Sequence, residues 1–374
     1  MSDPDGGMLS WDETVFRDES VFEIDHVPDR FPHRDSQLEQ LQYVLRPAVR
    51  GSRPLSAVVS GPPGTGKTTA IQTLFADLDG RSGVRPVRVN CQVNSTRYSV
   101  FARLFEAVKG YEPPASGISF KEVFGDTIET VVDDAVLVVA LDDVNYLFYE
   151  DEASDTLYSL LRAHEEESGA KVGVIVVSSD PDLDVLAGLD SRVQSVFRPE
   201  NVYFPVYDEA EIVGILRARA ERGFREGVID PPVLDRTAAR TAETGDLRVG
   251  IDLLRRAGLR AESQGRTTIT TDDVESAYGT SKYLHLSRSL ASLSAPERAL
   301  VAVIADHDGE AAGTVYDAFH GATGLGYTRY SEIVNKLEEL GVIEAEYGGV
   351  EGRGRSRSLS LAYDREAVVE RLED

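Results

Sequence analysis

A short apolar run at residues 57–59 leads directly into the stretch Gly61-Pro62-Pro63-Gly64-Thr65-Gly66-Lys67-Thr68. This stretch satisfies the phosphate-loop pattern, in which a Gly and a Gly-Lys-Ser/Thr triplet are separated by four residues. The glycines let backbone N–H groups turn inward around a phosphate, and a helix beginning near Lys67 directs its positive dipole end there. The alternative is a glycine-rich turn without a ligand, but a preceding strand and a helix at 69–78 favour a nucleotide site. The stretch therefore predicts an α/β domain that binds a nucleoside triphosphate.

The side chains of this loop have separate expected roles. Lys67 can reach the β- and γ-phosphates, and the Thr68 hydroxyl can ligate Mg²⁺. We therefore expect ATP or ADP together with Mg²⁺ as cofactors. The loop residues expected to contact the nucleotide are Gly61, Pro62, Pro63, Gly64, Thr65, Gly66, Lys67, Thr68 and Thr69.

The composition limits the class of protein. A hydrophobic fraction of 41% over 374 residues is ample for two or three ordinary folded domains. No apolar run approaches the ~20 residues of a membrane span, and the acidic N-terminus M-S-D-P-D-G-G does not resemble a secretory signal. The single cysteine, Cys91, excludes intrachain disulfides and cysteine-based zinc sites. These features predict a cytoplasmic protein without a membrane partner.

The net charge of −25 normally argues against a nucleic-acid partner. Here, however, the acidic residues are spread along the whole chain, and only six of the 39 basic residues are Lys. Diffuse acid with little Lys is typical of a salt-loving cytoplasm, where the screening length falls to about 3 Å at 1 M salt. Local clusters of charge then say more about partners than the net charge does.

Two carboxylates follow a second apolar run, A-V-L-V-V-A-L-D-D at residues 135–143. A continuous apolar run is typical of a strand buried on both faces, and ligands bind at the carboxyl ends of such strands. In this Walker B arrangement we expect Asp142 to hold Mg²⁺ through water and Asp143 to orient or activate the attacking water. A further buried-strand pattern at 171–179 ends in hydroxyls, the last of them Ser179.

Two short segments have both a structural and a functional interpretation. His33-Arg34-Asp35 is either a solvated turn before an amphipathic helix or a wall of the base pocket. Arg192 and Arg198, beyond the third apolar strand, are either surface residues or charges that reach a neighbouring molecule's phosphate.

The pattern changes twice towards the C-terminus. Residues 207–279 give four amphipathic helices, which predict a small all-helical lid, and the remainder gives helix, helix, helix, strand, loop and strand, the winged-helix plan. We therefore predict a disordered leader at 1–14, an α/β nucleotide-binding domain with a parallel sheet at 15–205, a lid at 206–282 and a winged-helix DNA-binding domain at 283–374.

Polar side chains of the winged-helix region are candidates for contact with double-stranded DNA. The third helix carries five that could face a major groove: Arg329, Tyr330, Ser331, Asn335 and Lys336. The loop at 348–358 carries Arg353, Arg355 and Arg357 against a lone Glu351, the clearest basic cluster in the chain. Such a run is usually a solvated loop, but on a wing flanked by Gly and Ser we favour phosphate contact.

The order of these motifs resembles the archaeal initiator family related to the largest subunit of the eukaryotic origin recognition complex and to the cell-division-control helicase loader. The similarity covers nearly everything from Phe16 onward, and its motifs are V-P-D-R-F-P-H-R-D, the phosphate loop, L-D-D-V-N, S-R-V-Q-S, F-P-V-Y-D-E-A-E-I, G-D-L-R-V-G-I-D-L-L-R-R-A and the terminal winged helix. The resemblance implies a nucleoid-associated AAA+ ATPase that binds origin DNA, helps to load the replicative minichromosome-maintenance helicase and self-associates on DNA.

The resemblance also implies roles for individual residues. Val27, Pro28 and Arg34 would lie by the adenine, with Tyr207 of the lid on the nucleotide's other side. Arg248 would be the lid arginine that senses the γ-phosphate. Arg192 would be the arginine finger acting in a neighbouring subunit's site, and residues 117–123 would fall where the family's additional helix touches DNA.

Two residues depart from the family pattern. The Walker B motif usually ends in Asp-Glu, but here it ends in Asp142-Asp143, and the first sensor, usually Asn, is Ser179. The shorter Asp143 carboxylate and the shorter Ser179 hydroxyl predict slow hydrolysis, with ATP acting chiefly as a conformational ligand. The alternatives to an initiator are a STAND-type regulatory ATPase that acts at promoters and a paralogue that binds ATP and DNA without initiating replication.

Overall fold

The apolar runs predicted as strands form one parallel sheet in the computed structural model. Its strand order is β2-β3-β4-β1-β5, and the strands are β1 (Ala57–Ser60), β2 (Val84–Asn90), β3 (Val136–Asp142), β4 (Val172–Val177) and β5 (Glu200–Tyr203). Every pairing between neighbouring strands is parallel. The carboxyl ends of β1, β3 and β4 therefore meet at one edge of the sheet, where ligands of such folds bind.

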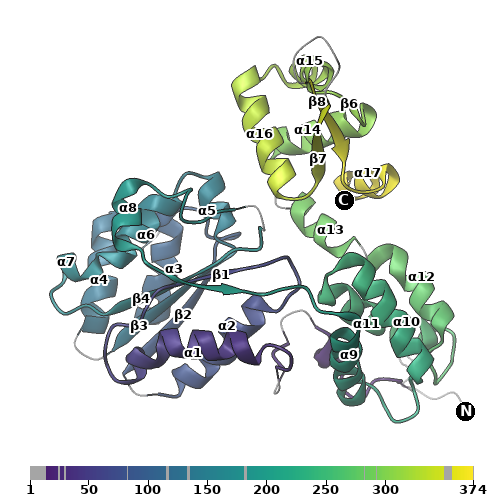
Figure 1. Ribbon diagram of the computed structural model, residues 1–374, viewed down its shortest axis with the longest axis horizontal. Coiled ribbons are helices and arrows are strands. Elements are labelled where there is room, and N and C mark those ends of the chain that lie inside the picture. Colours follow the sequence, from purple (N-terminus) through teal and green to yellow (C-terminus); the bar gives the residue numbers. More distant parts are fainter. Residues whose placement is uncertain are drawn as a thin grey trace, which may run out of the picture. The chain divides into compact units, whose positions relative to one another are not determined.

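The structure describes residues 14–23, 26–28, 31–81, 83–114, 118–132, 135–180, 183–281, 283–291, 293–348 and 356–373. Contacts divide the chain into two compact units, residues 1–278 and 279–374 (Figure 1). The predicted leader lies outside the described residues except for Thr14. The division of the first unit into a nucleotide-binding domain and a lid stays a prediction.

Helices cover both faces of the sheet (Figure 1). Along β3, Val136, Val138 and Ala140 pack in one core cluster and Leu137, Val139 and Leu141 in the other, which explains why this strand is apolar throughout. The first cluster is completed by α1 (Asp35–Val49) and α2 (Lys67–Asp79), and the second by α3 (Arg97–Lys109), α4 (Phe120–Val132), α6 (Ala153–Leu161) and α8 (Ser191–Val196). Two shorter helices, α5 (Asn145–Tyr149) and α7 (Ala163–Glu166), lie on either side of α6 in the sequence.

The helical part of the first unit has a core of its own, formed by α9 (Glu209–Gly223), α10 (Pro231–Thr244), α11 (Leu247–Ser263) and α12 (Thr271–Ser281). The N-terminal segment 14–23, which includes the 3-10 helix η1 (Glu19–Phe22), packs in this core. The Phe16 and Phe22 rings lie 5.2 and 4.6 Å from that of Phe224, and a Cβ at Gly258 would stand 2.5 Å from the Phe16 ring.

The predicted domain of residues 15–205 begins with this segment, and its boundary stays a prediction. The segment 14–23 packs with the lid helices because the rings of Phe16 and Phe22 contact the ring of Phe224. These residues are distant in sequence, so a linear pattern does not reveal the contact.

The second unit follows the predicted order of helices and strands. It contains α13 (Leu284–Ala291), α14 (Ala295–Asp306), β6 (Glu310–Ala311), α15 (Ala312–Thr323), α16 (Tyr327–Glu339), β7 (Ile343–Gly348), β8 (Ser356–Leu361) and α17 (Arg365–Glu373). The strands form an antiparallel sheet in the order β6-β8-β7. Relative to the prediction, the structure adds the helix α13, the short strand β6 and the terminal helix α17. None of the described helices of either unit is long and apolar enough to cross a membrane.

A buried charge pair ties α14 to α16 in this unit. The Glu297 carboxylate accepts hydrogen bonds from the Ser294 N–H at 2.8 Å and from the Lys336 ammonium at 3.1 Å. Burial alone would raise the pKa of Glu297, but these two partners outweigh it and hold the pKa below its ordinary value. The pair therefore stabilises the fold above that ordinary value, and its contribution is lost as the pH falls through the lowered pKa.

We expect Glu297→Gln to lower the free energy of unfolding of this unit at neutral pH by about 2 kcal/mol, because the half-buried Lys336 ammonium loses its charged partner. Denaturant unfolding between neutral and acidic pH at high KCl measures this. The difference from the unmodified protein should shrink as the pH falls below about 4.3, the ordinary pKa of Glu. The control is Glu332→Gln, which removes an exposed pair with Arg329 and should change little. Equal effects of the two substitutions would contradict the prediction.

Candidate nucleotide-binding site

The phosphate loop lies between β1 and α2, as predicted. Gly61, Gly64 and Gly66 have φ values of +142°, +71° and +91°, which residues other than glycine rarely adopt. The loop is also enclosed, because a Cβ at Gly66 would stand 2.7 Å from the Phe31 ring and 2.8 Å from the Tyr207 hydroxyl. Glycine is therefore required here both for the backbone conformation and for space.

The Lys67 side chain folds back into the loop. Its ammonium donates to the carbonyl oxygens of Gly61 and Pro62, both at 2.7 Å, and the residue is 4% exposed. Burial lowers the pKa of Lys67 to about 8. A cation that has lost most of its hydration is well placed to attract an anion entering the loop.

Thr68 and Asp142 come together at the carboxyl end of β3. The Thr68 hydroxyl donates to Asp142 Oδ1 at 3.2 Å. The other carboxylate oxygen, Oδ2, pairs with Arg88 Nη1 at 2.7 Å. Burial and the adjacent Asp143 raise the pKa of Asp142, against the opposing effect of Arg88. Hydroxyl and carboxylate oxygens are the ligands that Mg²⁺ prefers, usually one or two of them with substrate phosphates.

Among the described residues, no group of three or more His, Cys, Asp and Glu side chains could hold a metal ion by itself. The sparse donor set formed by Thr68 and Asp142 therefore fits an ion that is bound together with a nucleotide. Arg88 was not predicted from the sequence, because its contact with Asp142 depends on the register of β2 against β3.

Asp143 and Ser179 also meet, at the ends of the adjacent strands β3 and β4. The Ser179 hydroxyl donates to Asp143 Oδ1 at 2.8 Å. Asp143 has a φ of +53°, a conformation uncommon outside glycine but more accessible to Asp than to most side chains. The structure thus brings the two unusual residues of the motif into one hydrogen bond. Their catalytic roles stay predictions.

Arg34 is buried, with 2% of its surface exposed, which excludes the solvated turn as an interpretation of this residue. Its guanidinium donates to the carbonyl oxygens of Thr65 at 3.2 Å, His33 at 2.9 Å and Pro205 at 2.6 Å. It also lies 3.6 Å from the centroid of the Tyr207 ring. Arg34 therefore links the phosphate loop to the segment that follows β5.

Arg34 and Tyr207, which were expected on opposite sides of the nucleotide, are in direct contact in this structure, and their contact with a base stays a prediction. The guanidinium donates to its carbonyl partners and lies over the ring face. Of the other residues expected near the base, Val27 is exposed and Pro28 is half-buried. Their contact with a nucleotide stays a prediction.

We expect Arg34→Lys to lower the free energy of unfolding of the first unit by about 2 kcal/mol. A lysine ammonium lacks the planar guanidinium, so it cannot donate hydrogen bonds to all three carbonyls at once or stack on the Tyr207 ring. The control is Arg46→Lys, an exposed position on the same helix α1. Thermal or denaturant unfolding without nucleotide measures both variants. If the two are equally stable, the linking role of Arg34 is wrong.

The predicted lid arginine stands near the phosphate loop. Arg248 Nε donates to both carboxylate oxygens of Asp246, at 2.9 and 3.0 Å, and the Asp246 side chain borders Gly64 so closely that a Cβ there would clash. Burial alone would lower the pKa of Arg248, but Asp246 outweighs it and raises the pKa. The first turn of α11 thus reaches the loop, with the guanidinium engaged by Asp246. Its sensing role stays a prediction.

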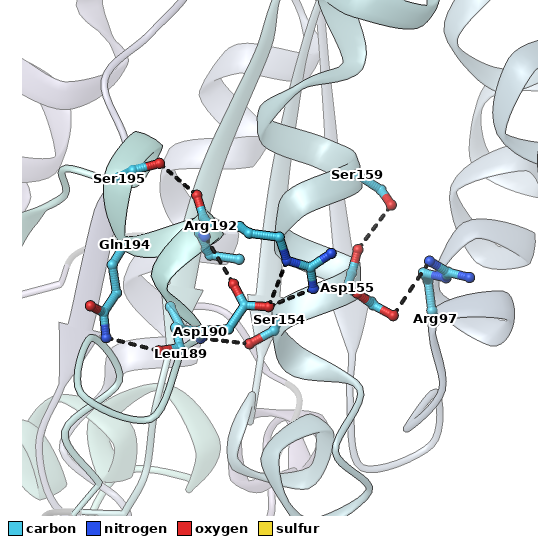
Figure 2. Close-up of polar contacts among 10 residues, drawn as sticks. Arg97, Ser154, Asp155, Ser159, Leu189, Asp190, Arg192, Gln194 and Ser195 are labelled. Atoms are coloured by element: carbon cyan, nitrogen blue, oxygen red, sulfur yellow. Dashed lines mark hydrogen bonds and ion pairs between the residues drawn. The ribbon is translucent and has the colours of Figure 1, made fainter.

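The predicted arginine finger lies on the surface at the start of α8. Figure 2 shows Arg192 held by two carboxylates: its Nε lies 3.0 Å from Asp190 Oδ2, and its Nη2 lies 3.2 Å from Asp155 Oδ1. Asp155 also pairs with Arg97 at 3.7 Å. The Arg192 side chain is 58% exposed, and Arg198 is exposed as well. Exposure is compatible with both interpretations offered for these arginines, so the finger stays a prediction.

The structure corrects two of the residues expected to face DNA. Tyr330 is 2% exposed and its hydroxyl donates to the Ala312 carbonyl at 2.7 Å, so it belongs to the core. Lys336 points to the buried Glu297. Tyr330 turns inward because the residues at 330, 333, 334 and 337 share the apolar face of α16. Lys336 is half-buried and is held by Glu297 of α14 instead.

The remaining candidates differ in exposure. Arg329 and Asn335 are exposed and Ser331 is half-buried. Arg357, on β8, pairs with Glu338. Arg353 and Arg355 lie outside the described residues, as does Gly117 of the segment 117–123, whose described part leads into α4. Contact of any of these residues with DNA stays a prediction.

Comparisons with known proteins agree with this fold. Residues 30–177 match the family model of the AAA ATPase domain, and residues 213–279 match that of the Cdc6 AAA+ ATPase-type lid domain. The sheet, phosphate loop and helical lid therefore define an AAA+ ATPase with a Cdc6-type lid.

Comparison with individual proteins identifies the family within this class of ATPases. The chain is 66% identical over 371 residues to the ORC1-type DNA replication protein 6 of Halobacterium salinarum, and 64% identical over 372 residues to the ORC1-type DNA replication protein 3 of Haloarcula marismortui. Each alignment covers 99% of both chains. The protein belongs to the family of ORC1-type DNA replication proteins, as the order of its motifs predicted. Both relatives come from halophilic archaea, which agrees with the acid-rich composition.

A solved structure supports the fold over the same length. The ORC1 protein of Aeropyrum pernix, determined in complex with DNA, superposes with a TM-score of 0.78 at 30% sequence identity and covers 96% of both chains.

Proposed function

We propose that this protein is an ATP-dependent initiator of DNA replication that binds double-stranded origin DNA and helps to load the replicative minichromosome-maintenance helicase. The observation that carries the proposal is the convergence of the phosphate loop, the Asp142-Asp143 pair and the first turn of α11 in one compact unit. The membership of the chain in a family of DNA replication proteins gives this site its context.

In this proposal the nucleotide is ATP or ADP. Backbone N–H groups of residues 64–66 and the N-terminus of α2 surround the phosphates, and Lys67 moves from its carbonyl partners to the β- and γ-phosphates. Thr68 and Asp142 hold Mg²⁺, which supplies charge compensation to the phosphates. Val27, Pro28, Arg34 and Tyr207 border the base and join the sheet to the lid.

Hydrolysis is slow, because Asp143 and Ser179 replace the longer side chains usual in the family. ATP then serves mainly as a ligand whose presence sets the conformation of the lid, with Arg248 sensing the γ-phosphate. Arg192 leaves Asp190 and Asp155 to complete a neighbouring copy's site when copies assemble side by side on DNA. Its exposed position on α8 supports this, because a finger must be able to reach another molecule.

The second unit contacts DNA. The antiparallel sheet with its preceding helices suits a winged helix, in which α16 enters the major groove and the loop between β7 and β8 contacts the backbone. The side chains that we propose for this contact are Arg329, Ser331, Asn335, Arg353, Arg355 and Arg357. The complex of the Aeropyrum pernix ORC1 protein with DNA supports this part of the proposal.

Chromatin immunoprecipitation followed by sequencing tests the proposed function in cells. Enrichment at the positions where replication starts is expected, and enrichment at promoters would instead favour a regulatory ATPase. Deleting the gene and mapping the origins that fire separates an initiator from a paralogue that binds without initiating. If every origin still fires at its normal frequency, this protein is not an initiator.

A further inference from the structure

Arg88 contacts the buried carboxylate of Asp142 from the neighbouring strand. In the parallel register of β2 and β3, Asn90 stands opposite Asp142 and Arg88 opposite Ala140. Because side chains alternate along a strand, Arg88 and Asp142 lie on the same face of the sheet. The long arginine side chain covers the diagonal step and places Nη1 2.7 Å from Asp142 Oδ2.

The two oxygens of Asp142 have different partners. Oδ1 accepts from the Thr68 hydroxyl at 3.2 Å, on the side of the phosphate loop. Oδ2 is taken by the guanidinium, at the shorter distance. The ion pair therefore fixes the rotation of the carboxylate, and it leaves Oδ1 directed at the loop.

A cation at this position stabilises the ionised form of Asp142. The Asp142 side chain is 2% exposed, so solvent stabilises its ionised carboxylate very little. The adjacent Asp143 adds repulsion between like charges. A buried charge without a partner is strongly destabilising, whereas a paired one is tolerated. Arg88 is itself 33% exposed and keeps part of its hydration, so it supplies this compensation at small cost.

We propose that Arg88 is a positioning residue that compensates the charge of Asp142 when no divalent cation is bound and holds Oδ1 toward Thr68. This rests on the proposed function only in taking Asp142 as the carboxylate of the Mg²⁺ site. In this proposal Arg88 acts through Asp142 and not on the phosphates. It allows the nucleotide-free protein to stay folded without a divalent ion.

The proposal predicts how each form responds to Mg²⁺ alone. With Arg88 present, the charge of Asp142 is already compensated. Mg²⁺ without nucleotide then raises the stability only through the general screening of the negative charges of an acidic protein. Without Arg88, the carboxylate lacks a cation, so Mg²⁺ acquires a specific stabilising site that the unmodified protein lacks.

The test compares Arg88→Met with Arg85→Met, since Arg85 is an exposed arginine on the same strand. Melting temperatures are measured at high KCl without nucleotide, with EDTA or with Mg²⁺. In EDTA, Arg88→Met is expected to melt about 5 °C below Arg85→Met. Mg²⁺ should recover at least half of that difference. If both variants shift equally on adding Mg²⁺, the proposal is overturned.

Two further variants separate charge from packing. The double substitution Arg88→Met with Asp142→Asn removes both charges, so it should melt above Arg88→Met in EDTA and show no specific response to Mg²⁺. Arg88→Lys keeps the charge and should respond to Mg²⁺ less than Arg88→Met does. A double variant that still responds like Arg88→Met would place the effect away from Asp142 and overturn the proposal.

ATP binding by the unmodified protein is measured separately. A failure to bind ATP would contradict the proposed function while leaving the melting comparison interpretable, so the two failures are distinguishable.

Discussion

Replacing Lys67 with Ala is expected to lower the affinity for ATP about a hundredfold, equivalent to about 2.7 kcal/mol. The ammonium is almost fully buried and is held by two backbone carbonyls inside the loop. When ATP binds, the ammonium exchanges two neutral carbonyl partners for an anionic phosphate. Charge-assisted hydrogen bonds of this kind are strong, and the site is poorly hydrated. Titration with a fluorescent ATP analogue and Mg²⁺ at high KCl measures the effect.

The matched control is Lys171→Ala. Lys171 also donates to a backbone carbonyl, that of Gly51 at 2.7 Å, but it is exposed and lies at the start of β4. Its loss should leave ATP affinity within about twofold, because no phosphate contact is involved. Melting curves of both variants establish that each is folded. An affinity of Lys67→Ala close to that of the control would contradict the assignment of the phosphate loop.

Replacing Asp143 with Glu is expected to raise the single-turnover rate of ATP hydrolysis by about tenfold, a modest share of what a positioned general base contributes. The Asp143 carboxylate is short and is held at 2.8 Å by the Ser179 hydroxyl. The added methylene lets the carboxylate extend past Ser179 to the place of an attacking water. Because Asp143 has a φ of +53°, the longer side chain has some cost in stability, which melting curves will reveal.

Two comparisons make this result specific. Asp143→Ala should abolish the residual hydrolysis while leaving ATP affinity nearly unchanged, since binding depends on Lys67 and Thr68. The double substitution Asp143→Glu with Ser179→Asn restores both family residues and should be at least as fast as the single one. A rate for Asp143→Glu no higher than that of the unmodified protein would mean that the short carboxylate does not limit hydrolysis.

Much of the nucleotide site could be predicted because its residues are close in sequence. The phosphate loop is one continuous stretch, and its strand and helix are set by adjacent apolar and helix-forming residues. Asp143 and Ser179 were each picked out because they end apolar runs, and the shared edge of parallel strands explains why the structure brings them together.

Arg88 could not be predicted in the same way. Its contact with Asp142 depends on the register of two strands more than 40 residues apart, and the sequence of either strand alone does not set that register. The docking of Phe16 and Phe22 on Phe224 depends likewise on segments that meet only in the folded chain.

Tyr330 is a different case, because the signal was present. Residues 330, 333, 334 and 337 follow the spacing of one apolar helix face, and Tyr330 is its first member. Its hydroxyl suggested an outward position, but a buried tyrosine needs only one hydrogen-bond partner, here the Ala312 carbonyl. The inward position of Lys336 depends on Glu297, a residue of another helix, and had no comparable signal.

As a conformational ligand, the nucleotide in the first unit is proposed to control the binding of DNA by the second. The most direct test of this claim is the equilibrium affinity for a labelled origin duplex at high KCl, measured with ATP and Mg²⁺, with ADP and Mg²⁺, and without nucleotide. We predict that the ATP and ADP forms differ about tenfold, within the usual range of coupling between two sites, and that Lys67→Ala abolishes the difference. Equal affinities in all three conditions, with ATP binding verified in the same samples, would contradict the claim.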